Sequence, residues 1–180
     1  MSDDKKLIVA LDFEDADHAR HLVNQLGDSV NFYKIGLELA YNGGLELARD
    51  LKDSGKSIFI DLKLHDIGTT VERATRQISK MGMDFLTIHG YSQTMEAARQ
   101  GADNNLKLLA VTVMTSYNDL DLALAGYAKS VQSTVANRAI QAKTHNIDGL
   151  ILSPLELFTV RQIVGPEMLL VTPGIRPNTA

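Results

Sequence analysis

The chain has 180 residues, of which 44% are hydrophobic and 22% are charged, with a formal net charge of −4. This apolar content excludes a disordered chain, and the absence of cysteine excludes disulfides and thiolate metal sites. No basic cluster exceeds Lys5–Lys6, and no apolar run approaches the roughly 18 residues of a membrane helix. We therefore expect a cytoplasmic protein with no nucleic-acid partner and no membrane partner.

Apolar runs typical of strands alternate with apolar residues at helical spacing along the whole chain. The third predicted helix carries a capping-box pattern, with Thr69 as the cap and Glu72 three residues later. In chain order the predicted elements are strand 6–13, helix 16–26, strand 32–37, helix 45–51, strand 58–64, helix 69–81, strand 85–89, helix 94–100, strand 106–115, helices 119–128 and 131–142, strand 150–152, helix 155–164 and strand 168–172.

Strict alternation of strands and helices predicts an α/β fold with a parallel sheet covered by helices. A (β/α)8 TIM barrel is the leading architecture, although only seven strands precede Ala180. We therefore expect residues 1–180 to form a single barrel domain that is truncated after strand 7 and lacks its eighth strand and flanking helices. A doubly wound open sheet is the alternative, but no G-x-G-x-x-G follows the first strand.

The segment DLKLHDIGTTV, residues 61–71, is the most informative part of the chain. Side chains two residues apart on a strand share a face, so Asp61 and Lys63 are expected to project together. Opposite charges on an apolar strand are costly to bury unless they are paired and used. Asp66 follows at the strand end, and the three charges together predict a prebuilt electrostatic site rather than a structural ion pair.

Active sites of barrels lie at the C-terminal ends of the strands. Lys34 follows two aromatic residues in an apolar strand, which favours a role in the site. Asp12 is equally compatible with capping the next helix, and the histidines are expected to be hydrogen-bonded structural residues. The polar residues predicted at the strand ends are Asp12, Lys34, Asp61, Lys63, His65, Asp66, His89, Thr115, Ser116 and Arg176.

Blocks of sequence from Leu7 to Pro177 resemble the orotidine 5′-phosphate decarboxylase family. They are, in order, VALDF, FYKIGLEL, DLKLHDIG, LTIHG, LLAVTVMTS, LILSP and TPGIRP. Many members have Pro-Asn where this chain has Gly68-Thr69, a change that a turn can tolerate. The family's phosphate-binding glutamine and late Gly-Arg pair would lie beyond Ala180, so a polypeptide that ends there is expected to be inactive or poorly folded.

The resemblance implies decarboxylation of orotidine 5′-phosphate to UMP and CO2 in pyrimidine biosynthesis, with no cofactor and no metal. It implies that Lys63 is the proton donor, that Asp61 lies beside the substrate carboxylate, and that Lys34 is the second ammonium of the charge array.

The resemblance also implies the residues that bind the rest of the nucleotide. Asp12 and Lys34 would contact the ribose, Thr115 the pyrimidine ring and Arg176 the phosphate. Asp66 and Thr70 would come from the neighbouring subunit, which implies a homodimer whose active site is shared across the interface.

Three other functions remain compatible with these residues. A related barrel decarboxylase could use the same acidic and lysine positions with Mg²⁺ and a sugar phosphate. A Schiff-base aldolase could use Lys63 as its nucleophile, although flanking carboxylates favour the protonated amine. A barrel without catalytic activity would bind nucleotides only.

Overall fold

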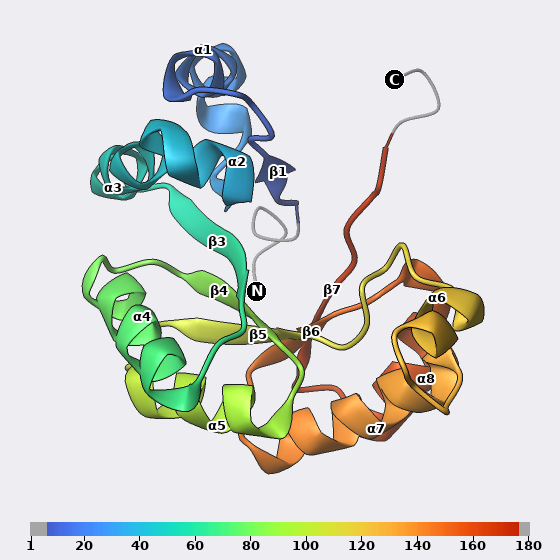
Figure 1. Cartoon of the computed structure of the whole chain (residues 1–180). Helices are drawn as coiled ribbons and strands as arrows, with labels where there is room; N and C mark the ends of the chain where they lie inside the picture. Colours follow the sequence, from blue (N-terminus) through green and yellow to red (C-terminus); the bar gives the residue numbers. More distant parts are fainter. Residues whose placement is uncertain (1–6, 177–180) are drawn as a thin grey trace.

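The computed structural model describes residues 7–176, and its centre is one curled parallel sheet (Figure 1). Its strands hydrogen-bond in the order of the sequence, from β1 to β7. The strands are β1 Val9–Ala10, β2 Phe32–Gly36, β3 Ser57–Leu64, β4 Phe85–His89, β5 Lys107–Val111, β6 Gly149–Ile151 and β7 Leu169–Val171.

Helices follow the strands and lie around the outside of the curl (Figure 1). The α-helices are α1 Ala16–Leu26, α2 Leu37–Leu39, α3 Leu45–Asp53, α4 Gly68–Lys80, α5 Ser92–Gly101, α6 Asp119–Leu124, α7 Val131–Thr144 and α8 Leu157–Val164. Short helical turns of other types are η2 Gly27–Ser29, η3 Ala40–Gly44 and η4 Pro154–Glu156.

This strand order confirms the predicted barrel-type α/β fold. A doubly wound sheet needs a point at which the strand order reverses, and the seven described strands show no reversal. The doubly wound alternative is therefore wrong. Each successive pair, from β1–β2 to β6–β7, is parallel, so the C-terminal ends of all seven strands meet at one rim of the curl.

Several local predictions were inaccurate. Strand β5 ends at Val111, four residues before the predicted end at Thr115. Strand β1 has only two residues, and the predicted start at Lys6 lies outside the described residues. The chain after β2 turns into α2 and η3 before the predicted helix begins. Helix α4 begins at Gly68 and is not capped by Thr69, because the non-helical residue before it is Ile67 and Thr69 already lies in the first turn.

The two faces of the sheet pack against different partners. Side chains such as Tyr33, Ile58 and Leu86 join residues of the helices in the larger core. The alternate positions form a second core whose buried members all lie on strands, and the strands themselves therefore fill the inside of the curl. The buried members of this inner core are Phe32, Phe59, Phe85, Leu109, Val111 and Ile151.

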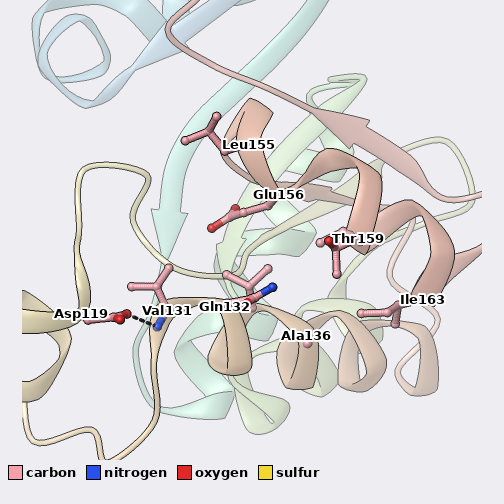
Figure 2. A pocket seen from close by; sticks show the side chains of 10 residues that line it. Asp119, Val131, Gln132, Ala136, Leu155, Glu156, Thr159 and Ile163 are labelled. Carbon is pink, nitrogen blue, oxygen red and sulfur yellow. Dashed lines mark hydrogen bonds between the residues drawn. The ribbon is translucent and has the colours of Figure 1, made fainter.

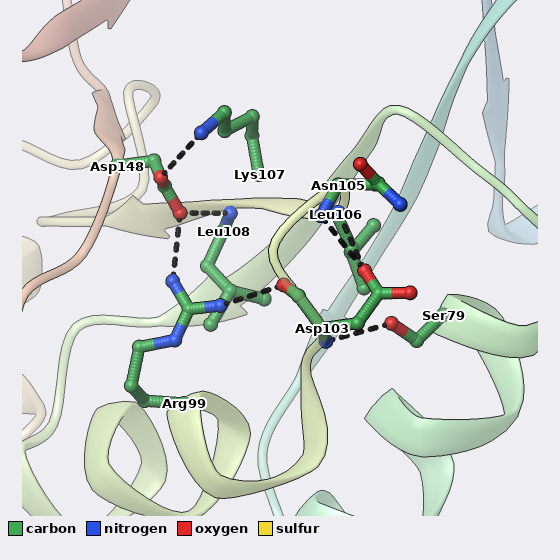
Figure 3. A network of polar contacts seen from close by, with 8 residues as sticks. All are labelled: Ser79, Arg99, Asp103, Asn105, Leu106, Lys107, Leu108 and Asp148. Carbon is green, nitrogen blue, oxygen red and sulfur yellow. Dashed lines mark hydrogen bonds and ion pairs between the residues drawn. The ribbon is translucent and has the colours of Figure 1, made fainter.

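Acidic residues secure the starts of two strands at the opposite rim. The Asp148 carboxylate, just before β6, accepts hydrogen bonds from the Leu108 backbone amide at 2.9 Å and from Arg99 at 3.0 Å, and it pairs with Lys107 at 3.2 Å (Figure 3). Asp84, just before β4, accepts from the Ile58 amide in the same way. These carboxylates join neighbouring strands where the ladder begins.

A third carboxylate, that of Asp103, organises the loop between α5 and β5 (Figure 3). It accepts hydrogen bonds from the backbone amides of Leu106 and Asn105. The bond from Leu106 is the main cause that holds the pKa of Asp103 below its ordinary value. The loop therefore enters β5 in a fixed conformation.

Replacing Asp148 with Ala is expected to lower the free energy of unfolding by about 2–3 kcal/mol, because it leaves the Leu108 amide and Nη1 of Arg99 without their acceptor. Urea denaturation measures this loss. Asp28→Ala is the matched control, since the Asp28 side chain is fully exposed and lies 3.6 Å from Lys56. A loss below about 0.5 kcal/mol for Asp148→Ala would contradict the assigned role.

Candidate functional site

The candidate site lies on the inner face of the sheet, one layer above a cluster of phenylalanine rings. Phe32 on β2, Phe59 on β3 and Phe85 on β4 form the lower layer, with ring centroids 4.9 Å apart for Phe32–Phe85 and 6.0 Å for Phe59–Phe85. The period of two along each strand places Lys34 and Asp61 directly above two of these rings. The same alternation that builds the apolar floor therefore builds the charged layer.

Four charged side chains form a continuous chain of ion pairs in this layer. Lys34 Nζ lies 3.0 Å from Asp12 Oδ1 and 3.5 Å from Asp61 Oδ2. Lys63 Nζ lies 2.8 Å from Asp61 Oδ1. The order is thus Asp12–Lys34–Asp61–Lys63, with cations and anions alternating.

Exposure of these side chains falls toward the middle of the chain. Asp12 is 66% exposed, whereas Lys34 is 19% and Asp61 is 13% exposed. An enclosed carboxylate is stable only with compensating charges and donors, and Asp61 has both neighbouring ammonium groups. The array leaves Lys63, at 27% exposed, as a cation that a ligand can still reach.

Asp12 takes part in this array and does not cap helix α1. The cap of α1 is Asp15, whose side chain accepts from the His18 amide at 2.9 Å. The capping alternative for Asp12 is therefore wrong.

The other predicted site residues lie on the same rim but outside the array. Asp66 follows β3, is exposed and accepts from the Ile67 amide at 2.6 Å; within residues 7–176 it is not in ion-pair distance of a lysine. Thr70 is exposed in the first turn of α4, and Thr115 is exposed in the turn after β5. Arg176 is exposed at the end of the described segment after β7.

The two histidines join an aromatic group beside the site. His65 stacks on Tyr91 with centroids 4.5 Å apart, and its Nδ1 lies 3.0 Å from the Thr94 hydroxyl. His89 is half-buried, and this burial is the main cause that lowers its pKa, with His65 and Arg138 adding to the effect. A lowered pKa keeps the His89 ring neutral at neutral pH.

Sequence reasoning missed two contributors to this region. Thr87 is fully buried on β4, and its hydroxyl donates to Asp61 Oδ1 at 2.8 Å. Arg138 reaches from α7 to lie 4.4 Å from the Tyr91 ring centroid. The period of two on β4 could have found Thr87, which lies two residues before His89, but a contact from α7 leaves no such local signal.

Comparison with known proteins identifies the family to which the chain belongs. Residues 5–180 match the sequence profile of the orotidine 5′-phosphate decarboxylase / HUMPS family. The chain belongs to this family. The resemblance found in the sequence motifs is thereby confirmed.

Curated members of the family are similar over almost the whole chain. Orotidine 5′-phosphate decarboxylase of Bradyrhizobium sp. (strain ORS 278) is 61% identical over 173 residues, which cover 96% of this chain and 71% of the relative. The enzyme of Rhodopseudomonas palustris (strain ATCC BAA-98 / CGA009) is 56% identical over 179 residues, covering 99% of this chain and 76% of the relative.

Solved structures of the family share the fold. The crystal structure of orotidine 5′-phosphate decarboxylase from Lactobacillus acidophilus superposes with a TM-score of 0.87 at 37% identity, covering 95% of this chain and 81% of that chain. In the part of our structure that is described, no helix combines the length and apolar character needed to cross a membrane.

A cavity of about 300 Å³ lies away from the charge array, between the N-terminal half of α7 and the segment from η4 into α8 (Figure 2). Most of its lining is aliphatic, including Val131, Val135 and Ile163. Glu156 lines it too, and burial raises the pKa of this carboxyl, whose oxygen accepts from the Ser153 amide. The cavity lacks the alternating charges of the Asp12–Lys34–Asp61–Lys63 array on the inner face.

Proposed function

We propose that the protein is a cytoplasmic orotidine 5′-phosphate decarboxylase that forms UMP and CO2 in pyrimidine biosynthesis without a cofactor or metal. The observation that carries this proposal is the Asp12–Lys34–Asp61–Lys63 array above an apolar floor. Curated relatives that are 56–61% identical carry the name of this enzyme.

The reaction requires stabilisation of an electron pair that stays at C6 of the pyrimidine when CO2 leaves. That pair lies in the plane of the ring and has no conjugated acceptor, so fixed positive charge is the means of stabilisation. We assign this charge to Lys63, whose ammonium is held by Asp61 at 2.8 Å. Lys63 then donates its proton to C6, and the neutral amine takes a proton back from solvent.

Asp61 has a different role in this proposal. Its carboxylate lies beside the substrate carboxylate, and the repulsion between the two is relieved as CO2 leaves. Lys34, 3.5 Å from Asp61, keeps the array neutral enough to form before substrate binds. Asp12 is the most exposed member, so it is free to bind a ribose hydroxyl, together with Lys34.

The remaining parts of the nucleotide would be bound by residues on loops at the same rim. Thr115 would contact the pyrimidine, and Arg176 would bind the phosphate. Asp66 and Thr70 are exposed and separate from the array, which agrees with their serving the site of a partner subunit in a homodimer.

The arrangement of charges disfavours the two alternative enzymes, a Mg²⁺-dependent barrel decarboxylase and a Schiff-base aldolase. A cation bound at Asp61 would be repelled by ammonium groups within 3.5 Å on either side, which opposes a role for Asp61 as a Mg²⁺ ligand. A nucleophilic Lys63 must be neutral, and its contact with Asp61 stabilises the cation instead.

Replacing Lys63 with Ala in the full-length protein is expected to abolish measurable loss of orotidine 5′-phosphate, because both the charge at C6 and the proton are removed. The assay follows the absorbance of the substrate, and EDTA is expected to leave the wild-type rate unchanged. Lys52→Ala is the control, since Lys52 pairs with Asp84 at the opposite rim. A fall of less than about tenfold, roughly 1.4 kcal/mol of transition-state stabilisation, would be too small for a proton donor.

A hybrid dimer tests whether Asp66 acts across the interface. One subunit carries Lys63→Ala and the other Asp66→Ala, with different affinity tags so that the hybrid is purified alone. If Asp66 serves the partner's site, one site has both defects and the other is intact, so about half of the wild-type activity is expected. If Asp66 serves its own subunit, both sites are defective and the hybrid is as inactive as the two parent dimers.

A further inference from the structure

The ladder between β3 and β4 is interrupted at the charge array itself. Ile60 pairs with Leu86 and Leu64 pairs with Ile88, so residues 61–63 face the single residue Thr87. A regular ladder would place one residue opposite one residue, and here β3 carries two more than its partner. The extra residues form a bulge that contains both Asp61 and Lys63.

The backbone of Lys63 is unusual within this bulge. Its φ is +48°, in the left-handed region that a residue with a side chain rarely adopts. Such a conformation persists only where the surroundings hold it in place. Because the bulge breaks the ladder, the Lys63 amide needs another acceptor.

The side chain of Thr87 supplies that acceptor. Its hydroxyl oxygen accepts from the Lys63 amide at 2.9 Å, and the hydroxyl donates to Asp61 Oδ1 at 2.8 Å. The same carboxylate oxygen receives the Lys63 ammonium at 2.8 Å. One buried hydroxyl thus holds two groups in place. The first is the backbone of Lys63, and the second is the Asp61 carboxylate that orients the Lys63 ammonium.

We infer that Thr87 is a positioning residue that holds Lys63 in its left-handed conformation and so sets where its ammonium lies. This inference deepens the proposed decarboxylation and rests on it for the effect on rate. Thr87 does not lie against the reacting atoms in this account, and its effect is transmitted through Asp61 and Lys63. The hydroxyl is the part that matters, because it is the only group of the side chain that can both donate and accept.

Matched variants of the full-length protein test the inference. Thr87→Val keeps the shape of the side chain and removes the hydroxyl, whereas Thr87→Ser keeps the hydroxyl. Thr112→Val is the control for loss of a buried hydroxyl, since Thr112 is fully buried and donates to the Ile151 carbonyl away from the array. Each variant is assayed for kcat and KM with orotidine 5′-phosphate and for hydrogen exchange of the Lys63 amide.

We expect Thr87→Val to lower kcat at least about tenfold with a smaller change in KM, because a displaced ammonium is costly in the transition state. We also expect faster exchange of the Lys63 amide in this variant. Thr87→Ser should restore both properties to within about threefold of the wild type, and Thr112→Val should leave both unchanged.

Two results would overturn the inference. The first is a Thr87→Val protein with wild-type kcat and wild-type exchange at Lys63. The second is an equal loss of kcat in Thr87→Val and Thr112→Val, which would indicate general destabilisation. If the wild type does not turn over orotidine 5′-phosphate, the proposed function fails, while amide exchange in the three variants still decides whether Thr87 holds the Lys63 backbone.

Discussion

The enclosed carboxylate of Asp61 is the constraint on which the site depends. It is met from three directions, by Lys34 from β2, by Lys63 from its own strand and by the Thr87 hydroxyl from β4. An anion that is 13% exposed is unfavourable without such partners, and two of them, Lys34 and Thr87, lie on the two neighbouring strands. The parallel sheet therefore assembles the charge array as a consequence of its register.

On the inner face of the sheet, one layer of side chains contributes to stability and the next layer carries the charges assigned to the reaction. Phenylalanine rings fill the lower layer, and the charges occupy the next positions along the same strands. At the opposite rim, Asp84 and Asp148 accept hydrogen bonds from the amides of neighbouring strands and stabilise the ladder. Changes at that rim are thus expected to affect folding, whereas changes at the upper layer are expected to affect the reaction.

The sequence predicted much of this organisation because the signals were local. Apolar runs located β2 to β7, and the charges at 61 and 63 indicated the strand that carries the candidate site. Local sequence signals failed where contacts between distant parts of the chain determine where an element begins or how a strand is shaped. Thr69 matches a capping box as well as Ser153 does, yet Ser153 caps η4 whereas Thr69 lies inside α4, which begins two residues earlier than a helix capped by Thr69 would. The bulge at Lys63 was missed because it depends on pairing with β4.

The most direct test of the account is the crystal structure of the full-length protein with a UMP analogue that carries an oxyanion at C6. This anion mimics the charge that develops when CO2 leaves. We predict that Lys63 Nζ lies about 2.8 Å from the oxyanion, with Asp61 on the other side of the ammonium. A Lys63 side chain directed away from C6, or a different cation at that oxygen, would contradict the central claim that Lys63 stabilises and protonates the carbanion.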